Sequence, residues 1–216
     1  MTAVRPPKVP ATRDEGIIDL LGPDAVLDAL DFRGLSLADG DLRGASLDGV
    51  RIERCRLERA DLSGARLVDT MVVGCDLATA VLEGTELIRC ELSECGLVGV
   101  DLSTARLRDV RLTDCRLDLA SLRFTRLEST VVASCSLRSA DLHGAELSDV
   151  RFDGCDLSEA DLSVVGADRA DLRGSLLVDV RHASRLRGAR IDELQLAQIA
   201  RSLALDAGIE IESDHD

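Results

Sequence analysis

Hydrophobic residues recur at every fifth position through most of this chain. From Phe32 to Leu177 the interval holds for 30 consecutive positions, of which 24 are Leu. Five of the other six are Phe, Ile or Val, and the sixth is Ala167. From Gly40 onward, the residue two places before each of them is no larger than Val or Thr. Residues 30–180 therefore follow a repeat of the form small-x-Leu-x-x, with no insertion.

A five-residue period fits neither a helix nor a plain strand. In a helix, successive Leu residues would lie about 140° apart and cover its whole surface. In a flat strand, alternate Leu residues would point to opposite faces. A chain that turns a corner every five residues places the small residue and the Leu of each side inward, and leaves the other three positions for solvent and the corner.

The number of sides in each coil follows from a second, longer period. The character of the inward small residue returns at every fourth side, which means a coil of four sides rather than three. Parallel strands of successive coils would then stack and bury a ladder of Leu. We predict a four-sided β-helix of between seven and eight coils. The clearest marker is a column of Cys residues: Cys55, Cys75, Cys95, Cys115, Cys135 and Cys155.

The two ends depart from the repeat. Residues 1–13 contain three Pro without periodicity and are predicted to be flexible. The apolar segment 14–29 is expected to cap the first coil, with a helical turn after Pro23. We therefore divide the chain into an N-terminus and cap (1–29), a β-helix (30–187) and a C-terminal segment (188–216).

The C-terminal segment predicts a helix from about Asp192 to Asp206. Asp192 is the candidate N-cap, Gly208 ends the helix, and residues 209–211 alternate like a short strand. The apolar stripe of this helix exceeds what capping one coil requires, so we predict that it joins two copies of the chain. The predicted dimer residues are Leu194, Leu196, Ile199 and Leu203.

The repeat resembles the pentapeptide-repeat family, whose motif is small, Asp or Asn, Leu or Phe, polar, any. The segments ADLSG at 60–64, ADLHG at 140–144 and GCDLSEADLS at 154–163 match it, and the resemblance covers about 150 residues. It implies an all-β solenoid, a right-handed quadrilateral β-helix. The right hand also agrees with the general preference of parallel crossovers.

The C-terminal segment also resembles the Qnr and MfpA group of this family. The matching residues are Gly188, Ile191, Asp192, Gly208, Ile209 and Ile211. The resemblance implies a homodimer through the C-terminal helix, and a rod that imitates duplex DNA, binds DNA gyrase and modulates or inhibits it. It extends to resistance to quinolones or other gyrase inhibitors. Because the repeat has no projecting loop, the chain is more similar to MfpA, which favours binding or inhibition over protection.

Charge qualifies this expectation. The chain has 40 acidic and 26 basic residues and a net charge of −14, which excludes direct binding to nucleic acid. Averaged over a rod about 36 Å long, the charge is sparser than that of DNA, so mimicry requires a local column. The side lined by Ala has six acidic residues against two basic ones, Arg43 and Arg123. Its acidic residues, the predicted partner-binding face, are Asp41, Asp61, Glu83, Asp101, Asp141 and Asp161.

Two interpretations of this column stay open. It is either a row of phosphate-like charges or the repeat's ordinary preference for Asp, which favours turns and solubility. The corresponding function classes are a DNA mimic and a generic protein-interaction scaffold with an unrelated partner.

No pattern indicates catalysis, a cofactor or a metal. A straight ladder of thiols cannot surround a tetrahedral ion, and no Gly-rich phosphate loop or nucleophile elbow is present. The chain has no apolar run that spans a bilayer and no signal-peptide pattern, and its odd number of Cys residues favours reduced thiols. We therefore predict a cytoplasmic, non-enzymatic protein without cofactor, metal or membrane partner.

Overall fold

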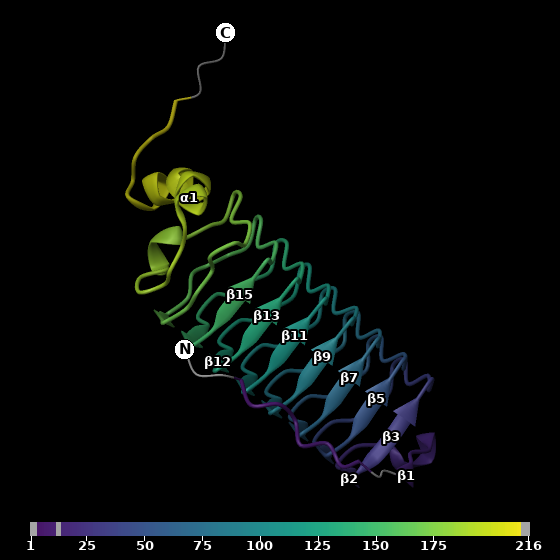
Figure 1. Cartoon of the computed structure of the whole chain (residues 1–216). Coiled ribbons are helices and arrows are strands. Elements are labelled where there is room, and N and C mark those ends of the chain that lie inside the picture. Colours follow the sequence, from purple (N-terminus) through teal and green to yellow (C-terminus); the bar gives the residue numbers. More distant parts are fainter. Residues whose placement is uncertain (1–3, 12–13, 213–216) are drawn as a thin grey trace.

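The chain forms a parallel β-solenoid with a C-terminal helix, shown in Figure 1 as a stack of coils along one axis. The computed structural model describes residues 4–11 and 14–212. Two adjacent sides of each coil are short strands, and these build two eight-stranded parallel sheets. The first sheet consists of β1 (Asp14–Glu15), β3 (Leu30–Arg33), β5 (Arg51–Glu53), β7 (Met71–Val73), β9 (Glu91–Ser93), β11 (Arg111–Thr113), β13 (Val131–Ala133) and β15 (Arg151–Asp153). The second consists of β2 (Val26–Asp28), β4 (Ser46–Asp48), β6 (Arg66–Val68), β8 (Glu86–Ile88), β10 (Arg106–Arg108), β12 (Arg126–Glu128), β14 (Glu146–Ser148) and β16 (Gly166–Asp168).

The other two sides of each coil pair through single-residue bridges at the same spacing of one coil. The backbone of Arg56 forms a parallel β-bridge with the backbone of Asp76 on the side lined by Cys. Asp41 and Asp61 form the same kind of bridge on the side lined by Ala. The predicted coil of four five-residue sides is therefore confirmed. Ala167 keeps this register opposite Leu147, although it replaces Leu in the repeat.

The inward ladder is buried as the repeat predicts. On the side of Ala60 and Leu62, both side chains are buried, and the whole Cys column lies inside the solenoid. Most five-residue sides end in a residue with a left-handed backbone, such as Gly64 (φ 67°) or Asp69 (φ 48°). These residues make the corners, which explains the frequency of Gly, Asp and Ser there.

The N-terminal segment differs from the prediction. Residues 4–11 are not free, because they run along the outside of the corner between the two sheets. The Arg5 guanidinium donates two bonds to Asp109 (3.0 and 2.6 Å), and the backbone N–H of Lys8 donates to Asp69 (2.9 Å). The rest of the segment predicted to be flexible, residues 1–3 and 12–13, lies outside the described residues.

The solenoid also begins earlier than predicted. β1 pairs with β3 and β2 pairs with β4, so parallel pairing starts at Asp14 rather than at residue 30. Asp14 lies opposite Leu30, an offset shorter than one full coil that the five-residue period cannot show. The helical turn expected after Pro23 is wrong, because the short 3-10 helix is Ile18–Leu20 and precedes that proline.

At the other end, α1 (Glu193–Asp206) covers the last coil (Figure 1). Asp192 caps it as predicted, in a capping box with Gln195. The buried Gln195 amide also donates to the carbonyls of Leu172 and Ser175, and the Gln198 side chain accepts from the N–H of Leu177. Side chains of the helix thus satisfy backbone groups that a further coil would otherwise pair.

Two details of this end correct the prediction. The last backbone bridge, Asp171 with Arg190, falls one residue short of a full coil, and the 3-10 helix Ala183–Arg185 precedes it. The strict five-residue period would have placed the next inward Leu at position 187. The buried residue is instead Leu186, one position earlier. Residues 209–211 do not form the predicted strand. The N–H of Ile209 instead bonds to the carbonyl of Ala204, which closes the helix end.

Candidate partner-binding face

The predicted acidic residues share one side of the solenoid, which we call the acidic side. Successive bridges align them one coil apart along the rod, with Glu83 beside the ladder at the coil of Val81. Neighbouring parallel strands are about 4.8 Å apart, which sets the spacing of the ladder. The order is Asp41, Asp61, Val81, Asp101, Ser121, Asp141, Asp161 and Arg181.

Each Asp of this ladder has a local structural contact. The Oδ1 atom of Asp101 accepts from the backbone N–H of Ser103 at 2.9 Å, and Asp141 accepts from His143 in the same way. Asp76, on the side lined by Cys, makes the same contact with Ala78. Asp before the inward Leu therefore stabilises the turn that follows, on more than one side. This contact supports the turn interpretation of the Asp preference.

Basic residues neutralise the two ends of the ladder more than its centre. Arg43 pairs with Asp41 (2.7 Å) and lies 3.8 Å from Asp61 in the next coil, and Arg123 pairs with Asp141 at 2.7 Å. Asp161 lies near Arg181 and His182. Within residues 4–11 and 14–212, Glu83 and Asp101 have no ion pair. The negative field of the acidic side is therefore strongest at these two residues.

The pKa values of Asp41 and Asp161, near the two ends of the ladder, are lowered. Hydrogen bonds from Arg43 lower the pKa of Asp41 to about 2. Burial raises the pKa of Asp161, but hydrogen bonds from Ser163 and the charge of His182 outweigh it, so that the net shift is downward. Asp41 and Asp161 therefore carry negative charge over the physiological range.

The predicted dimer residues divide into two pairs. Leu194 and Leu196 are 80% and 53% exposed on α1, so they are available to a partner. Ile199 is 3% exposed and packs in the chain's own core, and Leu203 is partly buried against it. The prediction is therefore wrong for Ile199, because this face of the helix covers the last coil. Sequence reasoning missed Leu205 and Ile209, which are also exposed.

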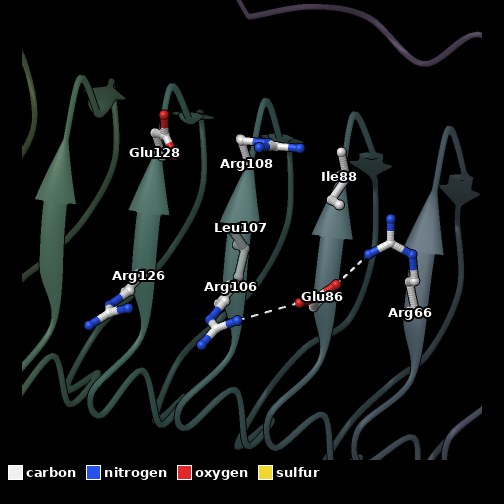
Figure 2. A pocket seen from close by; sticks show the side chains of 8 residues that line it. All are labelled: Arg66, Glu86, Ile88, Arg106, Leu107, Arg108, Arg126 and Glu128. Carbon is white, nitrogen blue, oxygen red and sulfur yellow. Dashed lines mark hydrogen bonds and ion pairs between the residues drawn. The ribbon is translucent and has the colours of Figure 1, made fainter.

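A second surface feature was not predicted. A groove of about 560 Å³ crosses β6, β8, β10 and β12, on the side that follows the acidic side in each coil. Figure 2 shows Glu86 between Arg66 and Arg106, to both of which it is paired, while Arg108 lies at the far end of β10. We call it the arginine groove. It is lined by Arg66, Glu86, Ile88, Arg106, Leu107, Arg108, Arg126 and Glu128.

The thiols and helices carry no further site. All seven Cys residues are buried and free, and burial raises the pKa of Cys90 to about 11. In the part of the chain that the structure describes, no group of three or more possible ligands could hold a metal ion. Over the same residues, no helix has the length and apolarity needed to cross a membrane.

The solved structures to which this chain is similar include two repeat proteins. A trypsin-treated form of QnrB1, a plasmid-mediated fluoroquinolone resistance protein, is 22% identical over 92% of this chain and 97% of that chain, with a TM-score of 0.48. HetL, a pentapeptide repeat protein involved in heterocyst differentiation regulation in the cyanobacterium Nostoc, is 23% identical over 76% and 86%, with a TM-score of 0.35. At TM-scores below 0.5, neither likeness carries a conclusion about this chain. No curated protein matched the chain.

Family models identify the repeat directly. A model of the pentapeptide repeat region matches residues 85–162, and a model of eight pentapeptide repeats matches residues 25–64 and 60–97. Together these matches span more than half of the chain and include most of the coils that form the acidic side. The chain belongs to the pentapeptide-repeat family.

Proposed function

We propose that this protein acts by binding, as a DNA mimic whose acidic side docks on the DNA-binding surface of a type II topoisomerase such as DNA gyrase. The observation that carries the proposal is a straight ladder with one position per coil, in which Asp occupies five of the seven positions from Asp41 to Asp161. A row of fixed negative charges on a rod is the feature of duplex DNA that a basic protein cleft recognises first. The unpaired charges of Glu83 and Asp101 would contribute most.

The C-terminal helix supports the second part of the proposal, a dimer joined end to end. Asp192 caps the helix and Gly208 ends it with a left-handed backbone (φ 76°), in agreement with the tail pattern of the sequence. Its outer face exposes Leu194 and Leu196, which would be buried between two copies. A dimer of this kind would double the length of the acidic rod.

One observation favours the alternative of a generic interaction scaffold. The turn contacts of the Asp residues, together with the pairing of Asp41 by Arg43 and of Asp141 by Arg123, explain the ladder without any partner. The two functions differ in what the charge of Asp101 and Asp141 does. A DNA mimic needs the charge, whereas a turn needs only the acceptor oxygen.

The primary test is a supercoiling assay with purified gyrase, with and without a fluoroquinolone. A gyrase-binding mimic would reduce supercoiling, or preserve it against the drug, and the two arms separate an inhibitor from a protector. Addition of salt should weaken either effect, because complementary charge is screened. An absence of any effect at micromolar protein would favour the scaffold.

Charge reversal then locates the surface. We expect the pair Asp101→Arg and Asp141→Arg to weaken inhibition at least about tenfold, equivalent to about 1.4 kcal/mol. Asp101→Asn with Asp141→Asn keeps an acceptor oxygen for each turn and removes only the charge, so it should weaken inhibition in the same direction with an unchanged fold. Glu91→Arg with Asp153→Arg makes the same charge change on the opposite side. An equal loss from this control would reduce the effect to net charge.

The dimer has its own measurement. Leu194→Glu with Leu196→Glu should convert a dimer to a monomer in light scattering without unfolding it, because both side chains are exposed in one copy. Val26→Glu introduces one such charge at an exposed apolar residue near the other end and serves as the control for each single substitution, Leu194→Glu or Leu196→Glu. A monomeric wild-type protein at high micromolar concentration would contradict the dimer.

A further inference from the structure

A bulky aromatic residue occupies a corner of the acidic side where four other coils have glycine. Gly44, Gly64, Gly84 and Gly144 take this corner with a left-handed backbone, and Phe124 takes it with φ 55°. Non-glycine residues are disfavoured in this conformation, bulky ones most of all. The Phe124 side chain is nevertheless 53% exposed, so burial in the core does not explain its presence.

The opposite corner of the same side shows a second exception. Leu119 also has a left-handed backbone (φ 61°) and is 65% exposed, whereas the neighbouring coils have Gly99 and Ser139 at this corner. Leu119 and Phe124 thus lie at the two ends of one five-residue side. Between them lies Ser121, which interrupts the Asp ladder between Asp101 and Asp141. This side of the coil has no acidic residue and one basic residue, Arg123, whereas Asp101 and Asp141 occupy the ladder in the coils before and after it.

The Phe124 ring is held in place by its neighbours. It lies over Gly144 of the next coil, where a Cβ atom would come within 2.4 Å of the ring. The His143 ring meets it edge to face at a centroid distance of 5.4 Å, and the Arg123 guanidinium lies 5.6 Å from its centroid. Arg123 is in turn fixed by Asp141. The ring is therefore presented in a defined orientation rather than free to move.

An ordered, exposed aromatic residue surrounded by charged residues is typical of a binding hot spot. Aromatic side chains at the centre of an interface account for much of its affinity, while surrounding charges mainly raise the association rate and set the orientation. The fold requires a left-handed backbone at this corner, but it does not require a bulky residue there, and the strained placement of one is a further sign of function. These three observations, the strain, the exposure and the packed support, meet at Phe124.

We infer that Phe124, assisted by Leu119, is the anchor of the acidic side, that is, the residue whose contacts contribute most to the affinity for the partner. The inference rests on the proposed function and specifies the partner surface: a basic cleft of the topoisomerase with an apolar pocket beside it that receives the Phe124 ring. The Asp ladder brings the two proteins together, and Phe124 slows their separation. Charge alone would give a complex that dissociates quickly and is abolished by salt.

The test measures binding of gyrase to Phe124→Gly by surface plasmon resonance, together with thermal unfolding. We expect at least a tenfold weaker affinity, mostly through faster dissociation, and a melting temperature equal to or above that of the wild type, since glycine suits the corner. Leu119→Ser should weaken binding less. The control is Thr104→Gly, which changes the same corner one coil earlier, where φ is 57°. It should leave affinity unchanged.

The outcomes distinguish failure of this inference from failure of the proposed DNA-mimic function. If Asp101→Asn with Asp141→Asn weakens binding and Phe124→Gly does not, the DNA-mimic function stands and the anchor is wrong. If Phe124→Gly lowers the melting temperature well below that of Thr104→Gly, the ring has a structural role and the inference is overturned. No binding by the wild-type protein would overturn both proposals.

Discussion

The acidic side and the side that bears the arginine groove share the same inward pattern of a small residue and a Leu but differ on their outer surfaces. In one coil they are consecutive: Val100 and Leu102 line the inside of the first, and Ala105 and Leu107 line the inside of the second, all of them buried. Outward, the first presents Asp101, and the second presents Arg108 together with Arg106, which is paired with Glu86 of the preceding coil. One inner ladder thus supports two surfaces of different charge.

This contrast shows which positions the repeat constrains. Inward residues are limited in size because the solenoid has no room for larger ones, and the polar ones among them, such as Thr85 and Thr125, donate to backbone carbonyls. Outward residues have to satisfy only the turn, so their charge can vary from side to side. Asp on the acidic side meets the turn requirement through its own oxygen, whereas Arg66 and Arg106 on the other side share Glu86 instead. The difference in charge between the two sides is therefore decided by the outward positions.

The largest effect is expected for substitutions of the buried Leu residues, and they test whether the inner ladder is equally important on both sides. Leu102→Ala and Leu107→Ala should each reduce the free energy of unfolding by about 2–5 kcal/mol, because each leaves a cavity in the same ladder. Urea denaturation measures both. Leu102→Asp should prevent folding, since it buries an unpaired charge. A difference of several kcal/mol between the two alanine variants would show that the two sides are not equivalent inside.

A smaller effect is expected at the corner between the two sheets. Asp69 is nearly buried and accepts two bonds from the Arg89 guanidinium (2.7 and 2.6 Å) and one from the N–H of Lys8. Asp69→Asn would keep an acceptor but remove the ion pair, with a loss of about 2 kcal/mol. Asp101→Asn on the acidic side has no ion pair to lose and should cost much less. Equal losses in thermal unfolding would contradict this distinction.

The same pair predicts a pH dependence. The bonds from Arg89 lower the pKa of Asp69 in the folded protein, although burial opposes them. A carboxylate with a lowered folded pKa contributes stability above its unfolded pKa of about 3.9, and that contribution is lost as the pH falls through the folded pKa. The difference in stability between wild type and Asp69→Asn should therefore be largest near neutral pH and shrink below about pH 4. A constant difference from pH 7 to pH 3 would exclude this origin.

The fold was predictable wherever the period holds. The Leu ladder, the Cys column and the capped helix all follow from spacing or from a local signal at Asp192. The docked N-terminal segment was not predictable, because Lys8 meets Asp69 and Arg5 meets Asp109 across 61 and 104 residues without any repeat between them. The pairing of Asp14 with Leu30 and the burial of Leu186 were likewise not predictable, because neither follows the five-residue period.

The sequence predicted that the acidic residues of the candidate site lie on one line, but not which of them are neutralised by ion pairs. The period places Asp41 and Asp61 on one line, yet it does not show that Arg43 reaches the second of them from the preceding coil. A stripe on a helix does not reveal which residues face the chain's own coil, so Ile199 was assigned to the wrong surface. Phe124 was recognisable only when its backbone angle and the space over Gly144 were known.

The smallest expected effect concerns the outside of the arginine groove. Glu86→Gln removes the carboxylate shared by Arg66 and Arg106, whose side chains remain about half exposed or more. Exposed ion pairs contribute about 0–1 kcal/mol, because solvent screens them and the long side chains lose freedom when they pair. We therefore expect a loss of stability below about 1 kcal/mol in urea denaturation, and no change in gyrase binding, since the groove lies off the acidic side. Glu86→Gln would, however, make the groove more positive by one charge. If this variant strengthened binding to gyrase, the partner would be contacting the groove rather than the Asp ladder, and the roles assigned to the two sides would have to be exchanged.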